Sequence, residues 1–189
     1  MDRKPVSVKS YANIAIVKYW GKADAERMIP STSSISLTLE NMYTETKLSF
    51  LPEDATGDVM YIDDELQGEK ETTKASKVLD LFRNNSNQHV KIETWNNMPT
   101  AAGLSSSSSG LSALVKAANE LFQVGKTQSE LAQIAKFASG SSSRSFFGPL
   151  AAWDKDSGEV YQVETDLKLA MIMLVLTDQK KPVSSRDGM

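Results

Sequence analysis

The sequence predicts an α+β domain built on a mixed or largely antiparallel sheet. Stretches of alternating apolar residues predict strands early in the chain and again near its end, and amphipathic segments between them predict helices. Strands grouped before and after helices, instead of alternating with them, are typical of the α+β class. With 189 residues, of which 40% are hydrophobic, the chain can bury one substantial core.

In the first half of the chain, strands are predicted where apolar residues alternate with polar ones. The corner 40–42 separates two such stretches, so we expect one antiparallel strand on each side of it. The segment 70–83 carries apolar residues at helical spacing, which predicts a helix. The predicted strands of this half are 6–8, 14–16, 35–39, 43–50, 59–62 and 89–95.

The second half of the chain is predicted to hold two helices and three strands. Apolar residues recur at helical spacing from 111 to 122, and those of 129–138 lie on one helical face. Residues 154–158 combine aspartate, serine and glycine, which is typical of a hairpin turn. The predicted strands are 150–153, 159–163 and, as a buried apolar run, 169–177.

Composition argues against several classes of function. The net charge of −3 and the pI near 5.3 disfavour a broad basic surface for nucleic acid. The chain has no cysteine and one histidine, His89, which excludes thiol chemistry and histidine metal clusters and argues against a Ser–His–Asp triad. Because the run 169–176 is too short to span a bilayer and residues 1–5 lack the apolar core of a signal peptide, we expect a cytoplasmic protein with no membrane partner.

Residues 99–110 carry the strongest functional signal, a glycine and a run of five serines that lead into a helix. The first N–H groups of a helix have no partner within it and, with the helix dipole, attract phosphate. Gly103 permits a close approach to an anion, and the serine hydroxyls can add hydrogen bonds. The segment matches neither the Walker nor the Rossmann pattern. A serine-rich linker is the alternative, but a helix follows directly.

Three further segments gather polar groups that core packing does not require. The first, 11–22, holds two lysines beside aromatic residues, although edge-strand charges would also explain the lysines. The second, 139–149, sets Arg144 among small hydroxyl residues that together can hold a carboxylate or phosphate, although a helix C-cap and loop would also fit. The third, 184–187, again sets an arginine among hydroxyls, or is a solvated tail.

Together these segments resemble the signature stretches of the diphosphomevalonate decarboxylase family, within the GHMP small-molecule kinase superfamily. The resemblance extends through the whole chain and is greatest to the bacterial members. It implies an amino-terminal domain with a fold similar to the second domain of ribosomal protein S5. It also implies ATP and Mg²⁺ as cofactors, 5-diphosphomevalonate as substrate, isopentenyl diphosphate as product, and a homodimer of the full-length enzyme.

The resemblance also implies roles for individual residues. For the ATP phosphates these are Gly103, Leu104, Ser105, Ser106, Ser107, Ser108 and Lys180. For the substrate they are Asn13, Tyr19, Lys22, Ser141, Arg144 and Arg186, with Asn13 and Arg144 at its carboxylate end. For catalysis they are Ser185, which would orient the reacting phosphoryl group, Arg144 and Lys18. No protein ligand to a metal is implied.

One segment of the family pattern does not occur in this sequence. The aspartate proposed to activate the 3-hydroxyl lies in an Asp-x-Gly-Pro-Asn-like segment, which residues 1–189 lack. We therefore expect residues 1–189 to be an amino-terminal domain without its carboxy-terminal domain, unable to turn over substrate alone. Two alternatives stay open: a GHMP kinase that does not decarboxylate, which the absence of a carboxylate from 139–145 disfavours, and a non-catalytic binding fragment.

Overall fold

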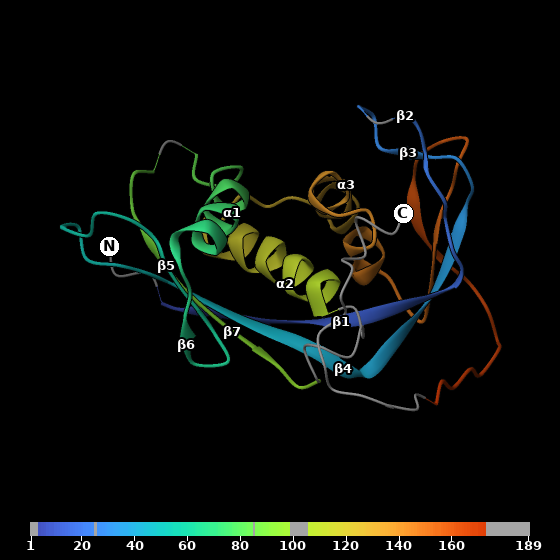
Figure 1. Cartoon of the computed structure of the whole chain (residues 1–189), viewed down its shortest axis with the longest axis horizontal. Coiled ribbons are helices and arrows are strands. Elements are labelled where there is room, and N and C mark those ends of the chain that lie inside the picture. The colour runs from blue at the N-terminus through green and yellow to red at the C-terminus, as the bar shows by residue number, and fades with distance from the viewer. Residues whose placement is uncertain (1–3, 25, 85, 99–105, 173–189) are drawn as a thin grey trace.

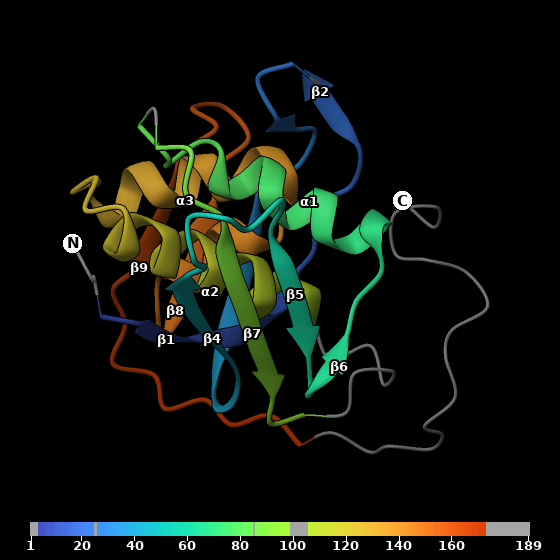
Figure 2. The same ribbon diagram turned by 90° about the vertical axis from the view of Figure 1, so that its left-hand side faces the viewer.

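Three helices lie on one face of a seven-stranded mixed sheet (Figures 1 and 2). The structure is a computed structural model that describes residues 4–24, 26–84, 86–98 and 106–172. The helices are α1 (Glu69–Leu79), α2 (Ser106–Leu121) and α3 (Gln128–Ala138), and the short 3₁₀ helix η1 (Ser142–Phe146) follows α3. The sheet contains β1 (Val6–Val17), β4 (Ser34–Phe50), β5 (Val59–Ile62), β6 (Glu65–Leu66), β7 (Val90–Asn96), β8 (Leu150–Trp153) and β9 (Val160–Val163). A separate pair consists of β2 (Lys22–Asp24) and β3 (Ile29–Pro30).

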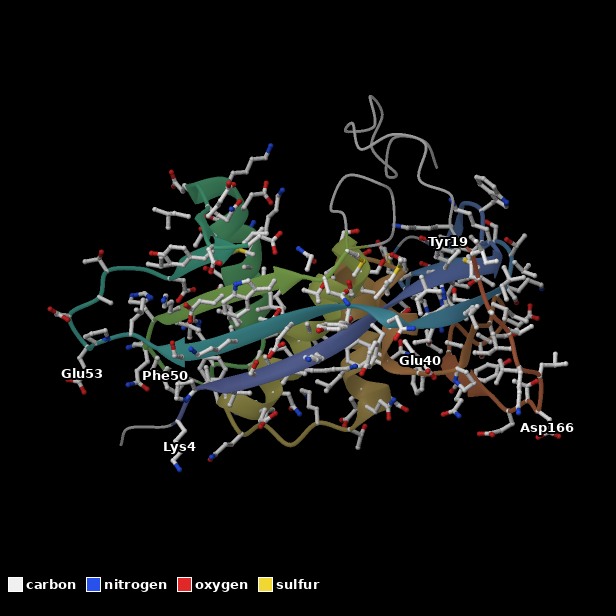
Figure 3. The ribbon with its side chains drawn as sticks, turned by 90° about the horizontal axis from the view of Figure 1, so that it is seen from below. Lys4, Tyr19, Glu40, Phe50, Glu53 and Asp166 are labelled. Carbon is white, nitrogen blue, oxygen red and sulfur yellow. The ribbon has the colours of Figure 1, made fainter. Side chains whose placement is uncertain are left out.

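The long strand β4 organises the sheet. On one side β1 pairs with it antiparallel along most of its length, and on the other side β7 pairs with residues 44–50 and β8 with residues 34–37. Since β5 runs parallel to β7, the sheet is mixed, which confirms the predicted class. Figure 3 shows Phe50, the last residue of β4, and Tyr19, just beyond β1, toward opposite ends of this layer.

The prediction of separate strands on either side of 40–42 is wrong. Tyr11 pairs with Tyr43 and the next residue, Ala12, pairs with Leu39, so residues 40–42 form a bulge within one strand. The polar residues at 40–42 resemble a turn in the local sequence. However, β1 pairs with β4 on both sides of 40–42 and keeps the two parts in one continuous ladder. For the same reason the predicted strands 6–8 and 14–16 are parts of the single strand β1.

Helix boundaries follow local signals closely. The Thr127 hydroxyl accepts a hydrogen bond from the backbone N–H of Glu130, and the Glu130 carboxylate accepts one from the backbone N–H of Thr127, which completes a capping box at the start of α3. In α1 the first turn carries Glu69 and Glu71 and the last turn carries Lys77, charges that favour the helix dipole. The predicted helices at 70–83, 111–122 and 129–138 are therefore confirmed, with shifted ends.

The main core lies between the helices and the sheet. Apolar residues of α1, α2 and α3 pack there on β4 and β7, where Leu48 and Ile92 are almost fully buried. Burying this surface is the main driving force that holds the helical layer in place. The hairpin of β8 and β9 contributes to a further, smaller apolar cluster around Trp153, which is completely buried.

The predicted buried strand at 169–177 is wrong for its described part, 169–172. These residues form no strand, and the side chains of Leu169 and Ile172 are 46% and 88% exposed. An apolar run becomes a buried strand only where a neighbour pairs with it, and none among the described residues does so. Residues 173–177 lie outside the described ranges.

Among the helices of the described residues, none is long and apolar enough to cross a membrane.

Candidate functional site

The structure brings three predicted site residues into one polar cluster. Asn13 of β1 donates from Nδ2 to the carbonyl of Ser141 at 3.0 Å and to Oγ of Ser145 at 2.7 Å. Oγ of Ser141 lies 2.5 Å from Oγ of Ser108, which is in the first turn of α2. The cluster therefore joins the beginning of α2, the strand β1 and the segment that enters η1.

The side chain of Arg144, on η1, is buried beside this cluster. It is 2% exposed, and it donates from Nε to Oγ of Ser36 at 2.6 Å and from Nη1 to Oγ of Ser34 at 3.1 Å. Burial lowers the pKa of Arg144 to about 10, so the guanidinium stays charged at neutral pH. No carboxylate in the described part of the chain forms an ion pair with it. A buried cation with only neutral partners is well suited to bind an anion.

Aromatic rings enclose the guanidinium of Arg144. Its Cζ lies 5.5 Å from the ring centre of Tyr19 and 5.9 Å from that of Trp153, and the two rings pack edge to face at 4.7 Å. Gly140 makes this packing possible, because a Cβ atom there would lie 2.8 Å from Cζ3 of Trp153 and 3.1 Å from the hydroxyl of Tyr19. A glycine at this position lets the chain before η1 approach the rings closely.

The two lysines predicted for the site are exposed. Lys18 lies just beyond β1, with Nζ 5.3 Å from the ring centre of Trp20. Lys22 belongs to β2 and pairs with Pro30 of β3. Among the described residues, no hydrogen bond joins either lysine to Arg144 or to the polar cluster, so their roles stay predictions, as does the substrate contact of Tyr19.

The serine run is helical in its described part. Residues 106–110, predicted as part of a turn, form the first turns of α2, because the apolar periodicity that follows extends the helix back into the serines. Ser107 is exposed, whereas Ser108 and Ser109 are buried, and Oγ of Ser109 lies 2.7 Å from the Thr44 hydroxyl. The remaining predicted residues lie outside the described ranges: Gly103, Leu104, Ser105, Lys180, Ser185 and Arg186.

An apolar cavity of about 380 Å³ adjoins the first turns of α2. Its walls come from α1, α2 and the central strands of the sheet, including Met60, Ala75, Ile92, Ser107 and Leu111. The described residues contain no group of three or more histidine, aspartate or glutamate side chains that could hold a metal ion. The polar cluster and this cavity thus flank the same end of α2 without a protein-based metal site among those residues.

Sequence reasoning missed the partners that hold Arg144 and Asn13. Ser34 and Ser36 alternate along β4, so both face the same side, and this spacing of two small hydroxyl residues was an available signal. Lys116 of α2 is a further omission, since a single lysine on an amphipathic helix reads as solvent-exposed. Its Nζ instead lies 3.2 Å from Oγ of Ser10 and 3.3 Å from the carbonyl of Ser145.

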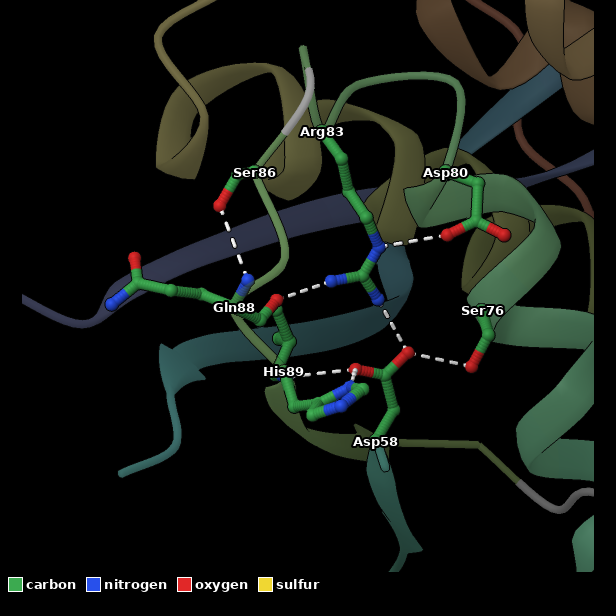
Figure 4. A network of polar contacts seen from close by, with 8 residues as sticks. Asp58, Ser76, Asp80, Arg83, Ser86, Gln88 and His89 are labelled. Carbon is green, nitrogen blue, oxygen red and sulfur yellow. Dashed lines mark hydrogen bonds and ion pairs between the residues drawn. The ribbon is translucent and has the colours of Figure 1, made fainter. Parts of the chain in front are cut away.

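A second polar network lies around Asp58, at the end of the sheet where β7 begins (Figure 4). The Asp58 carboxylate accepts hydrogen bonds from Oγ of Ser76 at 2.6 Å, from the backbone N–H of Val90 at 2.8 Å and from Nη2 of Arg83 at 2.5 Å. His89 Nδ1 lies 3.6 Å away. Burial alone would raise the pKa of Asp58, but these hydrogen bonds lower it below the ordinary aspartate value. The network ties α1 to β7 and serves the fold.

Comparison with known proteins identifies the family. The family described as "Diphosphomevalonate decarboxylase-like N-terminal domain" matches residues 10–163. The diphosphomevalonate decarboxylase of Saccharomyces cerevisiae is 35% identical over 97% of this chain and 52% of its own length, and that of Schizosaccharomyces pombe is 35% identical over 100% and 55%. The chain therefore spans about half the length of the curated relatives it matches.

Solved structures agree in fold and in sequence. The mevalonate pyrophosphate decarboxylase of Streptococcus pyogenes has a TM-score of 0.92 and 67% identity, covering 100% of this chain and 60% of that one. The mevalonate diphosphate decarboxylase of Staphylococcus aureus has a TM-score of 0.86 and 38% identity over 98% and 58%. A further similar structure, with 36% identity and a TM-score of 0.79 over 98% and 60%, is described as a complex with MVAPP, AMPPCP and magnesium. This chain belongs to the diphosphomevalonate decarboxylase-like family, and its residues 10–163 match the amino-terminal domain of that family.

Proposed function

We propose that the protein to which this chain belongs decarboxylates (R)-5-diphosphomevalonate in an ATP-dependent reaction. The products are isopentenyl diphosphate, ADP, phosphate and carbon dioxide. The observation that carries the proposal is the buried, charged Arg144, which is held by two serine hydroxyls and has no carboxylate partner among the described residues. Such a group can bind the carboxylate of a small acid.

The chemistry explains why this environment is suitable. A tertiary hydroxyl leaves only after it has been phosphorylated, and when the phosphate departs, positive charge develops on that carbon. The C–C bond to the carboxylate then breaks, and its electron pair forms the double bond as carbon dioxide is released. Arg144 can orient the carboxylate without acting as a nucleophile toward the developing cation. Asn13, fixed by Ser141 and Ser145, holds the neighbouring side of the site.

For the nucleotide, we propose that the phosphates bind at the beginning of α2. A helix N-terminus and its dipole generally favour an anion, and the exposed Ser107 can add a hydroxyl. The apolar cavity beside these turns offers space for a purine base. If Mg²⁺ is bound with the nucleotide, it would neutralise charge on the transferred phosphoryl group, and Ser106, Ser107 and Ser108 are the residues that we propose for this nucleotide-phosphate site.

The structure of a simple GHMP kinase site would differ at one point. A kinase that stops after phosphorylation would use an aspartate base in the Gly/Ser-rich segment 139–145, and this segment holds Arg144 and no carboxylate. This favours decarboxylation over phosphorylation alone. We further propose that the full-length protein is a homodimer, which sedimentation of that protein would test, and that it is cytoplasmic, which cell fractionation would test.

Two products distinguish these functions. Full-length protein, ATP, magnesium and diphosphomevalonate should release ADP and carbon dioxide in equal amounts, measured by coupled ADP assay and by trapping labelled gas. ADP without carbon dioxide would identify a kinase and refute the proposal. Residues 1–189 alone should release neither, because they lack an Asp-x-Gly-Pro-Asn-like segment, and turnover by them near the full-length rate would refute this expectation.

A further inference from the structure

Lys116 of α2 directs its ammonium group into the protein beside the candidate site. Nζ lies 3.2 Å from Oγ of Ser10 on β1 and 3.3 Å from the carbonyl oxygen of Ser145 on η1. It also lies 4.9 Å from the ring centre of Phe146. No carboxylate in the described ranges pairs with it, and burial lowers the pKa of Lys116 to about 8.

The oxygen atoms that Lys116 contacts belong to the network that holds Asn13. The carbonyl of Ser145 also accepts from Oγ of Ser10 at 3.3 Å, and Oγ of the same Ser145 accepts from Asn13 Nδ2 at 2.7 Å. Oγ of Ser10 in turn lies 2.7 Å from Oγ of Ser112, one helical turn before Lys116. One ammonium group therefore ties α2 to β1 and η1 at a single point.

This contact acts on the backbone one residue beyond Arg144. The Ser145 carbonyl belongs to the Ser145–Phe146 peptide, so fixing it restrains the backbone next to the residue from which the Arg144 side chain extends. The same restraint keeps Oγ of Ser145 within reach of Asn13. Movement of about 1 Å in groups that orient a substrate can reduce a rate about 100-fold.

A purely packing role would not require an ammonium group. Removing a charged amine from water costs free energy, and a methionine of similar length would pack against Phe146 without that cost. The hydrogen bonds to Ser10 and Ser145 offset this cost. A lysine that only covered apolar surface would extend its amine toward water, whereas this one reaches two internal oxygen atoms.

We propose that Lys116 is a positioning residue that sets the orientation of Asn13 and Arg144 toward the carboxylate end of the substrate. It does so through Ser10 and Ser145 and does not touch the substrate itself. This role rests on the proposed function, because it assumes that Asn13 and Arg144 bind the acid.

The test compares Lys116→Met and Lys116→Arg in the full-length protein, with Lys77→Met as a matched control. Lys77 is an exposed lysine of α1, so its replacement makes the same chemical change away from the network. Calorimetry with diphosphomevalonate alone, and separately with ATP alone, measures each affinity. Coupled ADP release gives kcat and KM, and thermal unfolding reports stability.

We expect Lys116→Met to weaken diphosphomevalonate binding about tenfold or more, while ATP binding changes less than about threefold. Lys116→Arg keeps a charged donor and should recover most of the affinity, and Lys77→Met should match the parent. A folded Lys116→Met variant with parental diphosphomevalonate affinity would overturn the proposal. An equal loss of both affinities alongside lower stability would also overturn it, since that pattern indicates a structural role.

If Lys116→Met does not fold, Lys116→Gln takes its place, because it keeps a donor without the charge. Weaker diphosphomevalonate binding by a folded Gln variant supports positioning, parental binding refutes it, and failure of both variants to fold refutes it too. Failure of the proposed function would look different. The parent itself would then release no carbon dioxide, whatever the effect of Lys116 on binding.

Discussion

Replacing Asp58 by alanine should destabilise the fold by about 3 kcal/mol. The carboxylate is 3% exposed and accepts hydrogen bonds from Ser76, Val90 and Arg83. Losing the hydrogen bonds from Ser76 and from Val90 costs about 1 kcal/mol each. Losing the ion pair with Arg83 costs about 1 kcal/mol more, and not the larger penalty of an unpaired buried charge, because Arg83 keeps its bonds to Asp80 and to the Gln88 carbonyl. For a chain of this size, 3 kcal/mol corresponds to a fall of about 6–12 °C in Tm.

Thermal and urea unfolding of the two proteins measure this difference, with Asp80→Ala as the control. The Asp80 side chain is 60% exposed and binds the same arginine at 2.7 Å, so its removal should cost less than about 1 kcal/mol. If Asp58→Ala and Asp80→Ala destabilise the protein equally, the Asp58 network does not hold α1 and β7 together as reasoned.

The same network predicts how stability depends on pH. The pKa of Asp58 in the folded protein is lower than its ordinary value of 3.8. Its contribution is therefore fully present above that ordinary value and is lost as the pH falls through the lower, folded-state pKa. The free energy of unfolding of the parent should fall more steeply than that of Asp58→Ala as the pH falls below about 4. Urea unfolding at a series of pH values measures this, and the same pH dependence in both proteins would count against the assignment.

Three further changes have expected outcomes. Arg144→Lys in the full-length protein keeps the charge but loses the bonds to the β4 serines, and kcat/KM for diphosphomevalonate should fall about 100-fold in the coupled assay; a loss below threefold would remove Arg144 from the site. Gly140→Ala forces a Cβ against the fully buried Trp153 and should destabilise the protein by about 1–3 kcal/mol, with a shifted tryptophan emission, and an unchanged unfolding midpoint would contradict the close contact. Thr127→Ala removes the capping hydroxyl of α3 and should cost about 1 kcal/mol by urea unfolding, whereas no change would mean that the capping box is dispensable.

The candidate site could be predicted in part. The sequence pattern predicted Asn13, Ser108, Ser141 and Arg144 as site residues. In the structure, hydrogen bonds join Asn13 to Ser141 and Ser141 to Ser108, and Arg144 follows three residues after Ser141. The sequence could not show that Lys18 and Lys22 are exposed and form no hydrogen bond with that cluster among the described residues, because side-chain exposure depends on how the elements pack. Nor could it reveal the serines of β4 or the inward direction of Lys116, which depend on how distant elements pack.

By itself, the sequence determined the helices, the hairpin of β8 and β9 and the family, because periodicity, capping and motif residues are local properties of the chain. Only the tertiary structure decided that β4 is one bulged strand, that residues 169–172 form no strand, and that Arg144 rests on Ser34 and Ser36. The physical reason is common to all three. Strand pairing and the burial of a charge depend on neighbours that are far away in the sequence, and the free energy of those contacts overrides the local pattern.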